Sequence, residues 1–468
     1  MKTDTIAAIA TALSESGIGI IRISGPEAIE VADKIFATRS GKHILKNCES
    51  HTIHYGFIRN QDEIVDEVMV SLMRAPRSYT TEDTVEINCH GGVLLMRKIL
   101  ETVLNNGARM AEPGEFTKRA FLNGRIDLSK AEAVMDLIHS SNDFAMRSSV
   151  KQLRGAVSDK IKNLRAKVIY EIAFIESALD DPEHISTEGY NEKLSEITDE
   201  MIRELKKLLA SADNGRMLKE GIQTVIVGKP NAGKSSLLNL MVGEEKAIVT
   251  DIAGTTRDVL EESIRLRGIG LNVIDTAGIR ATDDIVEQIG VERARKSAQE
   301  ADLLIYVVDT SVPLDESDHE IMDMLRDKKC VVLFNKTDLE SVVTEELFLE
   351  AYRTVNNGEE GESLRVIRTS TKEKRGIDEL EDVLEDMFFQ GKIKSNDEIV
   401  ITNMRHKEAL QDALNSLIMV KRSLEDDMPE DFYSIDLMSA YTSLGYIIGE
   451  EVGDDLVNEI FSKFCMGK

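Results

Sequence analysis

The feature that most constrains the fold is a glycine-rich loop between a short apolar strand and an apolar helix. It reads GKPNAGKS (Gly228 to Ser235), after a strand predicted for Gln223 to Val227 and before a helix predicted for Ser236 to Met241. In this context the backbone N–H groups close around phosphate and the helix dipole favours negative charge. Lys234 supplies a charge for the β- and γ-phosphates, and the Ser235 hydroxyl can bind Mg²⁺. The segment predicts a nucleotide-binding parallel sheet wound with helices.

A second motif predicts which base is bound. Asn335-Lys-Thr-Asp338 follows a strand predicted for Val331 to Phe334. An aspartate there can accept both the ring N–H and the exocyclic amino group of guanine, and adenine lacks that pair of donors. Ser370-Thr371-Lys372 follows a strand predicted for Val366 to Thr369, where a guanine-supporting loop is needed. The nucleotide is therefore predicted to be GTP.

The segment between these motifs carries candidates for the metal ion and the γ-phosphate. Asp275-Thr-Ala-Gly278 follows a strand predicted for Leu271 to Ile274. Asp275 is the candidate Mg²⁺-linked carboxylate, the Gly278 N–H can contact the γ-phosphate, and Thr256 is the candidate second Mg²⁺ hydroxyl. The predicted GTP-binding residues are Asn231, Ala232, Gly233, Lys234, Ser235, Ser236, Thr250, Thr255, Thr256, Asp275, Gly278, Asn335, Lys336, Asp338 and Ser370.

The residue after the Asp275 to Gly278 motif leaves a catalytic gap. Many GTPases carry glutamine there to orient the attacking water, whereas this chain carries Ile279. An apolar side chain cannot orient water, so another polar group is required. The nearby acids Glu287, Asp283 and Asp284 are candidates, and the residues themselves do not choose among them. Lys234 and Arg257 are further candidate catalytic residues.

The rest of the chain predicts a multidomain protein of α/β and helical parts. Val85, Ile87 and Cys89 alternate along a strand, as do Val68, Val70 and Leu72, so Glu86 and Asn88 share the opposite strand face. Ser129 to Glu132 has the form of a capping box at the start of a helical region. The predicted segments are an α+β domain at 1–118, a discontinuous helical domain at 119–215 and 391–468, and an inserted Ras-like P-loop domain at 216–390.

Composition narrows the class of protein. The chain has 468 residues, 42% of them hydrophobic, which is enough for more than one packed domain. The formal net charge of −27 argues against a protein that coats nucleic acid non-specifically. The four cysteines are scattered without zinc-type spacing, and no apolar run is long enough for a membrane helix. With no clean signal peptide, these features predict a cytoplasmic protein without membrane contact.

Five strings resemble the MnmE (TrmE) family of tRNA-modifying GTPases, and the resemblance spans the whole chain. They are GIIRISG (Gly19 to Gly25), PGEFTKRAFLNGRIDL (Pro113 to Leu128), GKPNAGKSSLLN (Gly228 to Asn239), VTDIAGTTRDV (Val249 to Val259) and FCMGK (Phe464 to Lys468). The nucleotide motifs alone fit several translation-linked GTPases. The flanking strings and their order select this family.

The resemblance implies a K⁺-stimulated enzyme whose GTPase domains meet across a homodimer. The positions that match the family's cation ligands are Asn231, Thr250, Ile252 and Thr255. A cation beside the phosphates can stabilise developing negative charge as an arginine finger does. The resemblance also selects Glu287 as the residue that orients water.

The resemblance further implies that the N-terminal domain, which also dimerises, binds a reduced folate, either 5-formyl- or methylene-tetrahydrofolate. The matching positions are Arg22, Glu86, Arg125 and Lys468. Arg125 stands where some members carry lysine, and Met466 stands where isoleucine is more usual. Cys465 is open to two interpretations, a group near the one-carbon unit or a small hydrophobic filler.

The implied reaction is tRNA modification at carbon 5 of the wobble uridine, which gives an aminomethyl or carboxymethylaminomethyl group. A separate FAD protein of the MnmG (GidA) type is the implied partner, in a heterotetramer or larger complex. No flavin or nicotinamide motif is evident in this chain. Two alternatives stay open: a ribosome-assembly GTPase of the Era or EngA kind, and a folate-binding protein with a regulatory GTPase domain.

Overall fold

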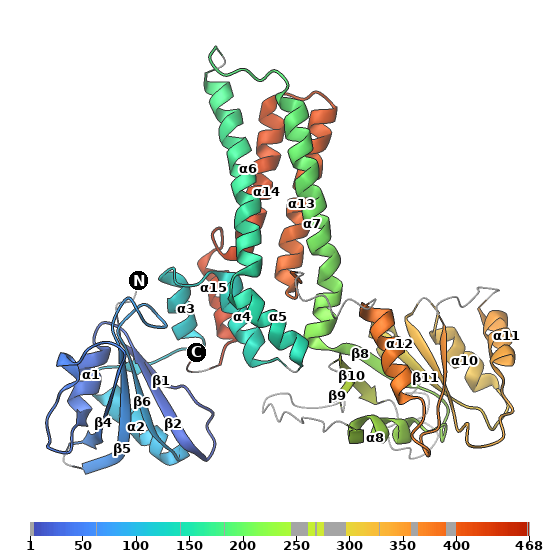
Figure 1. Cartoon of the computed structure of the whole chain (residues 1–468), viewed down its shortest axis with the longest axis horizontal. Coiled ribbons are helices and arrows are strands. Elements are labelled where there is room, and N and C mark those ends of the chain that lie inside the picture. Colours follow the sequence, from blue (N-terminus) through green and yellow to red (C-terminus); the bar gives the residue numbers. More distant parts are fainter. Residues whose placement is uncertain are drawn as a thin grey trace. The chain divides into compact units, whose positions relative to one another are not determined.

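The chain folds into two compact units. The computed structural model describes residues 4–61, 63–140, 142–181, 183–244, 261–266, 269–275, 296–326, 328–356, 364–389, 399–465 and 467 (Figure 1). Unit 1 comprises Met1–Ile138, Lys151–Asn191 and Arg422–Lys468, and unit 2 comprises His139–Val150 and Glu192–Lys421. The four segments predicted from the sequence remain a prediction.

Unit 1 begins with a sheet whose strand order is β3-β4-β5-β6-β2-β1-β7. Its strands are β1 (Ile6–Ile9), β2 (Ser16–Ser24), β3 (Phe36–Ala37), β4 (Thr52–Asn60), β5 (Glu63–Met73), β6 (Thr84–Gly91) and β7 (Arg109–Met110). A short 3₁₀ turn, η1 (Leu45–Asn47), and two helices, α1 (Ala28–Ile35) and α2 (Val93–Asn105), accompany it. The predicted alternation is confirmed, because Val85, Ile87 and Cys89 are buried in the core that α1 and α2 share with the sheet. Glu86 and Asn88 consequently lie on the opposite face.

The rest of unit 1 is helical. Its helices are α3 (Glu115–Leu122), α4 (Leu128–Ile138), α6 (Ala156–Asp180), α14 (Glu430–Ile448) and α15 (Asp454–Ser462). The predicted capping box at Ser129 is wrong, since the helix begins at Leu128 and Ser129 lies inside its first turn. Asp127 accepts from the Lys130 N–H at 3.0 Å and from the Ser129 hydroxyl at 2.6 Å, so the carboxylate one residue before the helix caps it.

Three helices span a boundary between the units: α5 (Asp143–Leu153), α7 (Tyr190–Glu220) and α13 (Met404–Glu425). Within unit 2, Lys421 on α13 pairs with Asp199 on α7 at 2.6 Å. Across the described residues, no helix combines the length and hydropathy needed to cross a lipid bilayer.

Unit 2 contains a sheet of strand order β13-β12-β11-β8-β10-β9. Its strands are β8 (Ile222–Val227), β9 (Glu261–Leu266), β10 (Ile269–Asp275), β11 (Leu303–Asp309), β12 (Cys330–Asn335) and β13 (Arg365–Arg368). All neighbouring strands run parallel except the edge pair β10 and β9. The predicted parallel-rich sheet is therefore confirmed.

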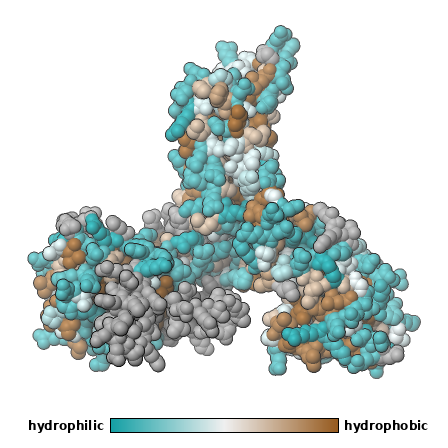
Figure 2. All heavy atoms as spheres, turned by 180° about the vertical axis from the view of Figure 1, so that it is seen from behind, coloured by the Kyte–Doolittle hydropathy of each residue, from teal (hydrophilic) through white to brown (hydrophobic). Residues whose placement is uncertain are grey.

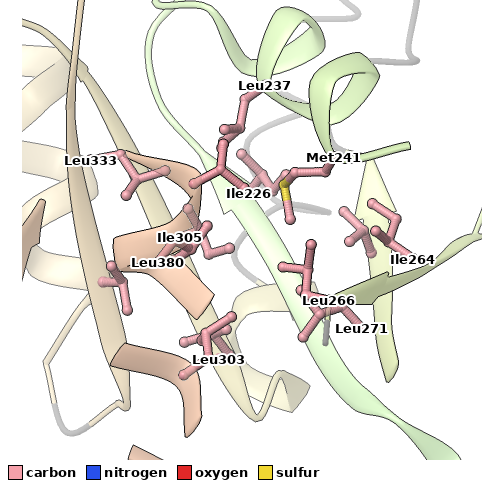
Figure 3. Packing of buried hydrophobic residues seen from close by; sticks show 14 of the residues in the cluster. Ile226, Leu237, Met241, Ile264, Leu266, Leu271, Leu303, Ile305, Leu333 and Leu380 are labelled. Carbon is pink, nitrogen blue, oxygen red and sulfur yellow. The ribbon is translucent and has the colours of Figure 1, made fainter. Parts of the chain in front are cut away.

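Helices cover both faces of this sheet: α8 (Lys234–Glu244), α10 (Glu316–Met324), α11 (Glu345–Val355) and α12 (Ile377–Phe389). On one face, Leu237 and Met241 from α8 and Leu380 from α12 pack against strand residues such as Ile305 (Figure 3). On the other face, α10 and α11 bury Met322, Phe348 and Tyr352 with further strand side chains. Burial on both faces explains why these strands are near-continuous apolar runs in the sequence.

Candidate nucleotide site and a second polar cluster

The glycine-rich loop joins the end of β8 to the first turn of α8. Gly228 has φ +150° and Gly233 has φ +104°. A Cβ on Gly228 would lie 2.5 Å from the Val307 carbonyl oxygen, and a Cβ on Gly233 would lie 2.2 Å from Asn335 Nδ2. Both positions therefore require glycine, because a side chain would strain the backbone and overlap a neighbour.

Lys234 folds back over its own loop. Its Nζ donates to the carbonyl oxygens of Gly228 at 2.6 Å and Lys229 at 2.8 Å. Ser235 and Ser236 are exposed in the first turn of α8, and Asn231 is exposed with a left-handed φ of +62°. Ala232 is buried beneath the loop. This is the arrangement in which loop N–H groups, an ammonium and a hydroxyl converge where phosphate binds a helix N-terminus.

Asn335 ties the guanine motif to the glycine-rich loop. Its side chain is 1% exposed. Nδ2 donates to the Ala232 carbonyl oxygen at 2.9 Å, and Oδ1 accepts from the Thr371 N–H at 3.2 Å. One buried amide thus joins three segments that the sequence placed in separate motifs.

Asp338 is held by the loop predicted to support guanine. The Ser370 hydroxyl donates to Asp338 Oδ1 at 2.8 Å, and Lys372 Nζ lies 3.8 Å from Oδ2. The Ser370 hydrogen bond is the main cause that lowers the pKa of the Asp338 carboxyl, and Lys372 contributes. The carboxylate is therefore ionised and positioned to accept two N–H groups.

Two ion pairs around these loops were missed by sequence reasoning. Lys336 Nζ lies 2.5 Å from Asp309 Oδ2 at the carboxyl end of β11. Burial alone would raise the pKa of the Asp309 carboxyl, but Lys336 and Ser311 outweigh burial and lower it. The position of Asp309 at the end of a buried parallel strand was the available signal.

The second missed pairing restrains the glycine-rich loop from outside. Lys229 Nζ lies 2.7 Å from Asp318 Oδ2 and 2.9 Å from Asp315 Oδ2. Burial lowers the pKa of Lys229, but these carboxylates more than compensate and raise it. Asp318 is buried and also accepts from the Tyr306 hydroxyl at 2.7 Å. No sequence pattern indicated this pairing, because a lysine and two acids about 90 residues away match many surface patterns.

Several predicted site residues lie outside the described residues: Thr250, Ile252, Thr255, Thr256, Arg257, Gly278, Glu287 and Lys468. Asp275 ends β10, and its backbone pairs with Ile226 of β8. Among the described residues, no group of histidine, cysteine or acidic side chains is arranged to hold a metal ion.

Unit 1 holds a second polar cluster, which we call the Tyr79 cluster. Its members are Arg22, Tyr79, Glu86, Arg125 and the carbonyl group of Gly467. The Arg22 guanidinium carbon lies 5.5 Å from the Tyr79 ring centre, and that of Arg125 lies 4.8 Å from it. Arg125 also donates to the Tyr79 carbonyl oxygen at 2.9 Å. Two of the four predicted folate residues, Arg22 and Arg125, therefore lie against an aromatic side chain that no sequence motif indicated, and a third, Glu86, pairs with Arg22.

Arg22 and Glu86 form the polar wall of the Tyr79 cluster. Arg22 contacts Glu86 Oε1 through two nitrogen atoms, each at 2.8 Å, and donates to the Gly467 carbonyl oxygen at 3.2 Å. Across the described part of the chain, the structure records no partner for Glu86 Oε2. Glu86 can therefore accept from a ligand N–H while it remains paired with Arg22.

The C-terminal segment reaches this cluster through close backbone contacts. Gly467 has φ +85°, and a Cβ there would lie 2.3 Å from the Ile9 carbonyl oxygen. Gly114 donates to the Cys465 carbonyl oxygen at 3.4 Å, and a Cβ on Gly114 would lie 2.5 Å from the Phe461 carbonyl oxygen. Cys465 itself is exposed. Glycine at position 467 thus allows the backbone there to lie beside β1 and Arg22.

Two family profiles match this chain. The profile described as GTP-binding protein TrmE N-terminus matches residues 5–125, and the profile described as MnmE helical domain matches residues 128–465. Three proteins named tRNA modification GTPase MnmE are similar along their length. The protein of Lachnoclostridium phytofermentans is 58% identical and covers 100% of both chains, and that of Clostridioides difficile is 50% identical over 99% of each. The Bacillus subtilis protein is 46% identical, over 99% of this chain and 100% of the relative.

A solved structure of Aquifex aeolicus Era bound to GDP and AlF₄⁻ covers 42% of this chain and 67% of that chain at 25% identity. Its TM-score of 0.28 is too low for an inference about the fold. The full-length identities and both profiles are sufficient without it. The chain belongs to the MnmE family of tRNA modification GTPases.

Proposed function

We propose that this chain is a K⁺-stimulated GTPase that modifies carbon 5 of the wobble uridine in certain tRNAs. The product carries an aminomethyl or carboxymethylaminomethyl group, and a reduced folate supplies the one-carbon unit. A partner protein of the MnmG (GidA) type supplies the flavin. Both proteins act in the cytoplasm. The observation that carries the GTPase part is the buried Asn335 amide, which joins the phosphate loop to the guanine loops.

The described loops offer several of the contacts that we propose for bound GTP. Lys234 would exchange the Gly228 and Lys229 carbonyl oxygens for β- and γ-phosphate oxygens, a charge-assisted replacement. The Asp338 carboxylate would accept the two guanine N–H groups, while Ser370 keeps its orientation. Ser235, with Thr256, would hold Mg²⁺, which neutralises phosphate charge when bound.

The remaining catalytic groups are proposed from the family resemblance. Asn231, Thr250, Ile252 and Thr255 would hold K⁺ near the phosphates. Asn231 supports this role because its exposed side chain stands in the loop itself. Glu287 would orient the attacking water in place of Ile279. Arg257 remains a candidate catalytic residue with no defined step.

The Tyr79 cluster supports folate binding on chemical grounds. A reduced pterin offers adjacent N–H donors and a flat ring, and a folate tail carries carboxylates. Glu86 Oε2 can accept from the N–H donors, the Tyr79 ring can stack on the flat ring, and Arg22 or Arg125 can pair with a carboxylate. Lys468, the residue after Gly467 in the sequence, is proposed as a folate residue from the family resemblance alone.

The free face of the N-terminal sheet supports a homodimer. Ile53 and Tyr55 on β4 and Met69 on β5 are 67%, 56% and 52% exposed. Tyr55 and Met69 are cross-strand partners, so these side chains are neighbours on one face. Hydrophobic residues also gather on this part of the surface in Figure 2. A contiguous apolar face of this kind is typical of a protein interface.

Both alternatives leave part of the chain without a role. An Era or EngA type of assembly GTPase does not account for the Tyr79 cluster or for the profile match at residues 5–125. A folate-binding protein with a merely regulatory nucleotide site predicts that modification survives without GTP hydrolysis. Substitution of Lys234 in the phosphate loop distinguishes this folate-binding alternative from the proposed function.

The experiment is complementation of a deletion strain with Lys234→Ala, followed by mass spectrometry of the wobble nucleosides. We expect loss of both the modified nucleoside and GTP hydrolysis. Lys206→Ala, an exposed lysine on α7, is the matched control and should restore modification. Normal modification by Lys234→Ala would reject coupling between GTP hydrolysis and tRNA chemistry. With the purified protein, replacing K⁺ by Na⁺ should slow GTP turnover, and equal rates would reject the cation role.

A further inference from the structure

A groove of about 430 Å³ opens in unit 2 between α11 and the segment that leads into α10. Its apolar lining is contributed by Pro313, Leu314, Val342, Val343, Leu347 and Ala351. Leu347 and Ala351 lie four residues apart on α11, so they present one helical face to the groove. The groove is therefore built from two loops and a rigid helix.

The apolar lining is open to solvent. Leu347 is 52% exposed and Val342 is 50% exposed. Leu339 and Val312, which stand beside the lining residues in the sequence, are exposed as well. Isolated exposed apolar residues are ordinary, but several that line one concave site are typical of an interaction surface.

The charges around the groove are almost all negative. Glu350 is part of the lining, together with His319. Helix α10 carries the exposed acids Glu316, Glu320 and Asp323, and α11 carries Glu345, Glu346 and Glu350. Arg353 is the one lysine or arginine on these two helices. Phosphate groups are repelled by such a rim, whereas lysine and arginine side chains are attracted to it.

Both walls of the groove are bonded to the nucleotide loops. On one side, the Pro313 carbonyl oxygen accepts from Lys229 of the phosphate loop at 3.4 Å, and Asp315 pairs with the same lysine. This side is therefore linked directly to the phosphate loop.

On the other side, the N–H groups of Val342 and Val343 donate to the Thr310 carbonyl oxygen at 2.7 and 3.1 Å. Thr310 follows Asp309, which pairs with Lys336 of the guanine motif. A molecule that shifts either wall would consequently shift a loop that contacts the nucleotide.

We propose that this groove docks a segment of a partner protein that presents a large apolar side chain between lysine or arginine residues. The apolar side chain fills the space between Leu314 and Leu347, and the basic residues pair with Glu350 and the acids of the rim. Because the walls are bonded to the nucleotide loops, docking changes nucleotide affinity, and nucleotide binding changes docking by the same factor.

The test is a binding titration of the full-length, GDP-loaded protein with short fluorescent peptides. One peptide carries Leu-Phe between lysines, a second carries Leu-Phe between glutamates, and a third carries Ser-Ser between lysines. We expect saturable binding of the first and at least about tenfold weaker binding of the others, since both the apolar anchor and the charge are needed.

Two groove variants should each weaken binding of the first peptide about tenfold: Leu347→Asp and Glu350→Lys. Both positions are exposed, so neither change removes a core contact. Glu379→Lys on α12 makes the same charge change at an exposed position outside the groove and should bind normally. Equal loss with Glu379→Lys, or equal binding of the Ser-Ser peptide, would reduce the effect to general charge attraction and overturn the proposal.

The release rate of bound GDP provides a second readout. Saturating Leu-Phe lysine peptide should change this rate at least about twofold in the unsubstituted protein and leave Leu347→Asp unaffected. An unchanged rate would overturn the coupling. A photo-crosslinking residue placed at Leu347 tests whether the groove binds a second copy of this chain instead of a partner protein. A crosslink between two copies of the chain would show self-association and overturn the proposal of a partner segment. The peptide titration does not require GTP hydrolysis. A failure of the peptide to bind would therefore overturn the docking proposal without affecting the proposed function.

Discussion

The nucleotide loops and the Tyr79 cluster are both small polar sites, but they are assembled in different ways. The nucleotide loops follow the ends of three parallel strands, β8, β12 and β13; β12 and β13 are neighbours, and β11 lies between β12 and β8. Each loop carries its function in three to eight consecutive residues. The Tyr79 cluster draws single side chains from separate segments, and Arg22 and Gly467 are 445 positions apart.

This difference decides which contacts hold each site together. In the nucleotide loops, backbone groups and one buried amide make the contacts that connect the loops. The required feature is therefore often the absence of a side chain, as at Gly228 and Gly233. In the Tyr79 cluster, long side chains meet around one aromatic ring. The first arrangement tolerates no added atom, whereas the second loses affinity in steps as single contacts are removed.

Gly233→Ala should produce the largest effect. The added Cβ would lie 2.2 Å from Asn335 Nδ2, at a φ of +104°. The left-handed backbone alone costs about 1–2 kcal/mol, and the overlap must also displace the Asn335 amide, so GTP affinity should fall by more than about 100-fold. Titration with a fluorescent GTP analogue measures the change.

Gly124→Ala is the control that separates strain from overlap. Gly124 has φ +73°, but a Cβ there meets nothing within 4 Å. It should lower the stability of unit 1 by about 1 kcal/mol and leave GTP affinity unchanged. An affinity of Gly233→Ala within about threefold of the unsubstituted protein would contradict the role assigned to the Asn335 contact.

The same difference explains what could be predicted from the sequence. The phosphate loop and its parallel sheet follow from consecutive motif residues and the apolar strands before them. The shared strand face of Glu86 and Asn88 follows from a local pattern with a period of two. Tyr79 could not be found this way, because it lies in an irregular loop and its role depends on two arginines from other segments. A sign was available in the string Ser-Tyr-Thr-Thr between two strands, where one aromatic residue stands among polar ones.

Charge pairs were equally hard to predict. Asp309 ends a strand, a place where functional acids are common. Its partner Lys336 belongs to the guanine motif, and nothing in that motif indicates an ion pair with Asp309. The predicted capping box at Ser129 was wrong because the sequence offers two side chains that could cap the helix, Asp127 and Ser129. Asp127 lies directly before the helix, and its carboxylate accepts from the Lys130 N–H. Local sequence patterns rank such alternatives poorly, since the two candidate caps differ by about two residues, which is the usual uncertainty of a helix end.

Tyr79→Leu should have an intermediate effect that is confined to unit 1. The change removes the ring beneath Arg22 and Arg125 while it keeps an apolar side chain. Because cation–π contacts contribute about 0.5–1 kcal/mol each at exposed sites, affinity for 5-formyl-tetrahydrofolate should fall about tenfold. Calorimetric titration measures this loss, and GTP affinity should stay constant.

Tyr79→Phe keeps the ring and removes only the hydroxyl that contacts Thr117 Oγ1 at 2.9 Å. It should bind the folate within about twofold of the unsubstituted protein. If Tyr79→Phe were as damaging as Tyr79→Leu, the hydroxyl contact and not the ring would organise the cluster. The contrast between a side-chain cluster and a backbone-defined loop would then need revision.

Ser370→Ala should have the smallest effect, and pH should reveal it. Ser370 donates to Asp338 and is the main cause that lowers the pKa of that carboxyl. Guanine requires the ionised carboxylate, so nucleotide affinity is retained above the pKa of Asp338 and is lost as pH falls through it. Without the Ser370 donor this pKa rises, and the loss must begin at a higher pH. Near neutral pH the variant should bind GDP only about threefold more weakly, because the Asp338 carboxyl stays ionised there and loses a single neutral donor.

The measurement is the dissociation constant of a fluorescent GDP analogue as a function of pH, for the unsubstituted protein and for Ser370→Ala. Thr371→Ala is a suitable control, because Thr371 contributes its backbone N–H to Asn335 and that group survives the substitution. Two parallel curves would mean that Ser370 orients the loop without changing the ionisation of Asp338. A shift of the acid limb in Ser370→Ala alone would show that even the loop-built site depends on one side-chain donor.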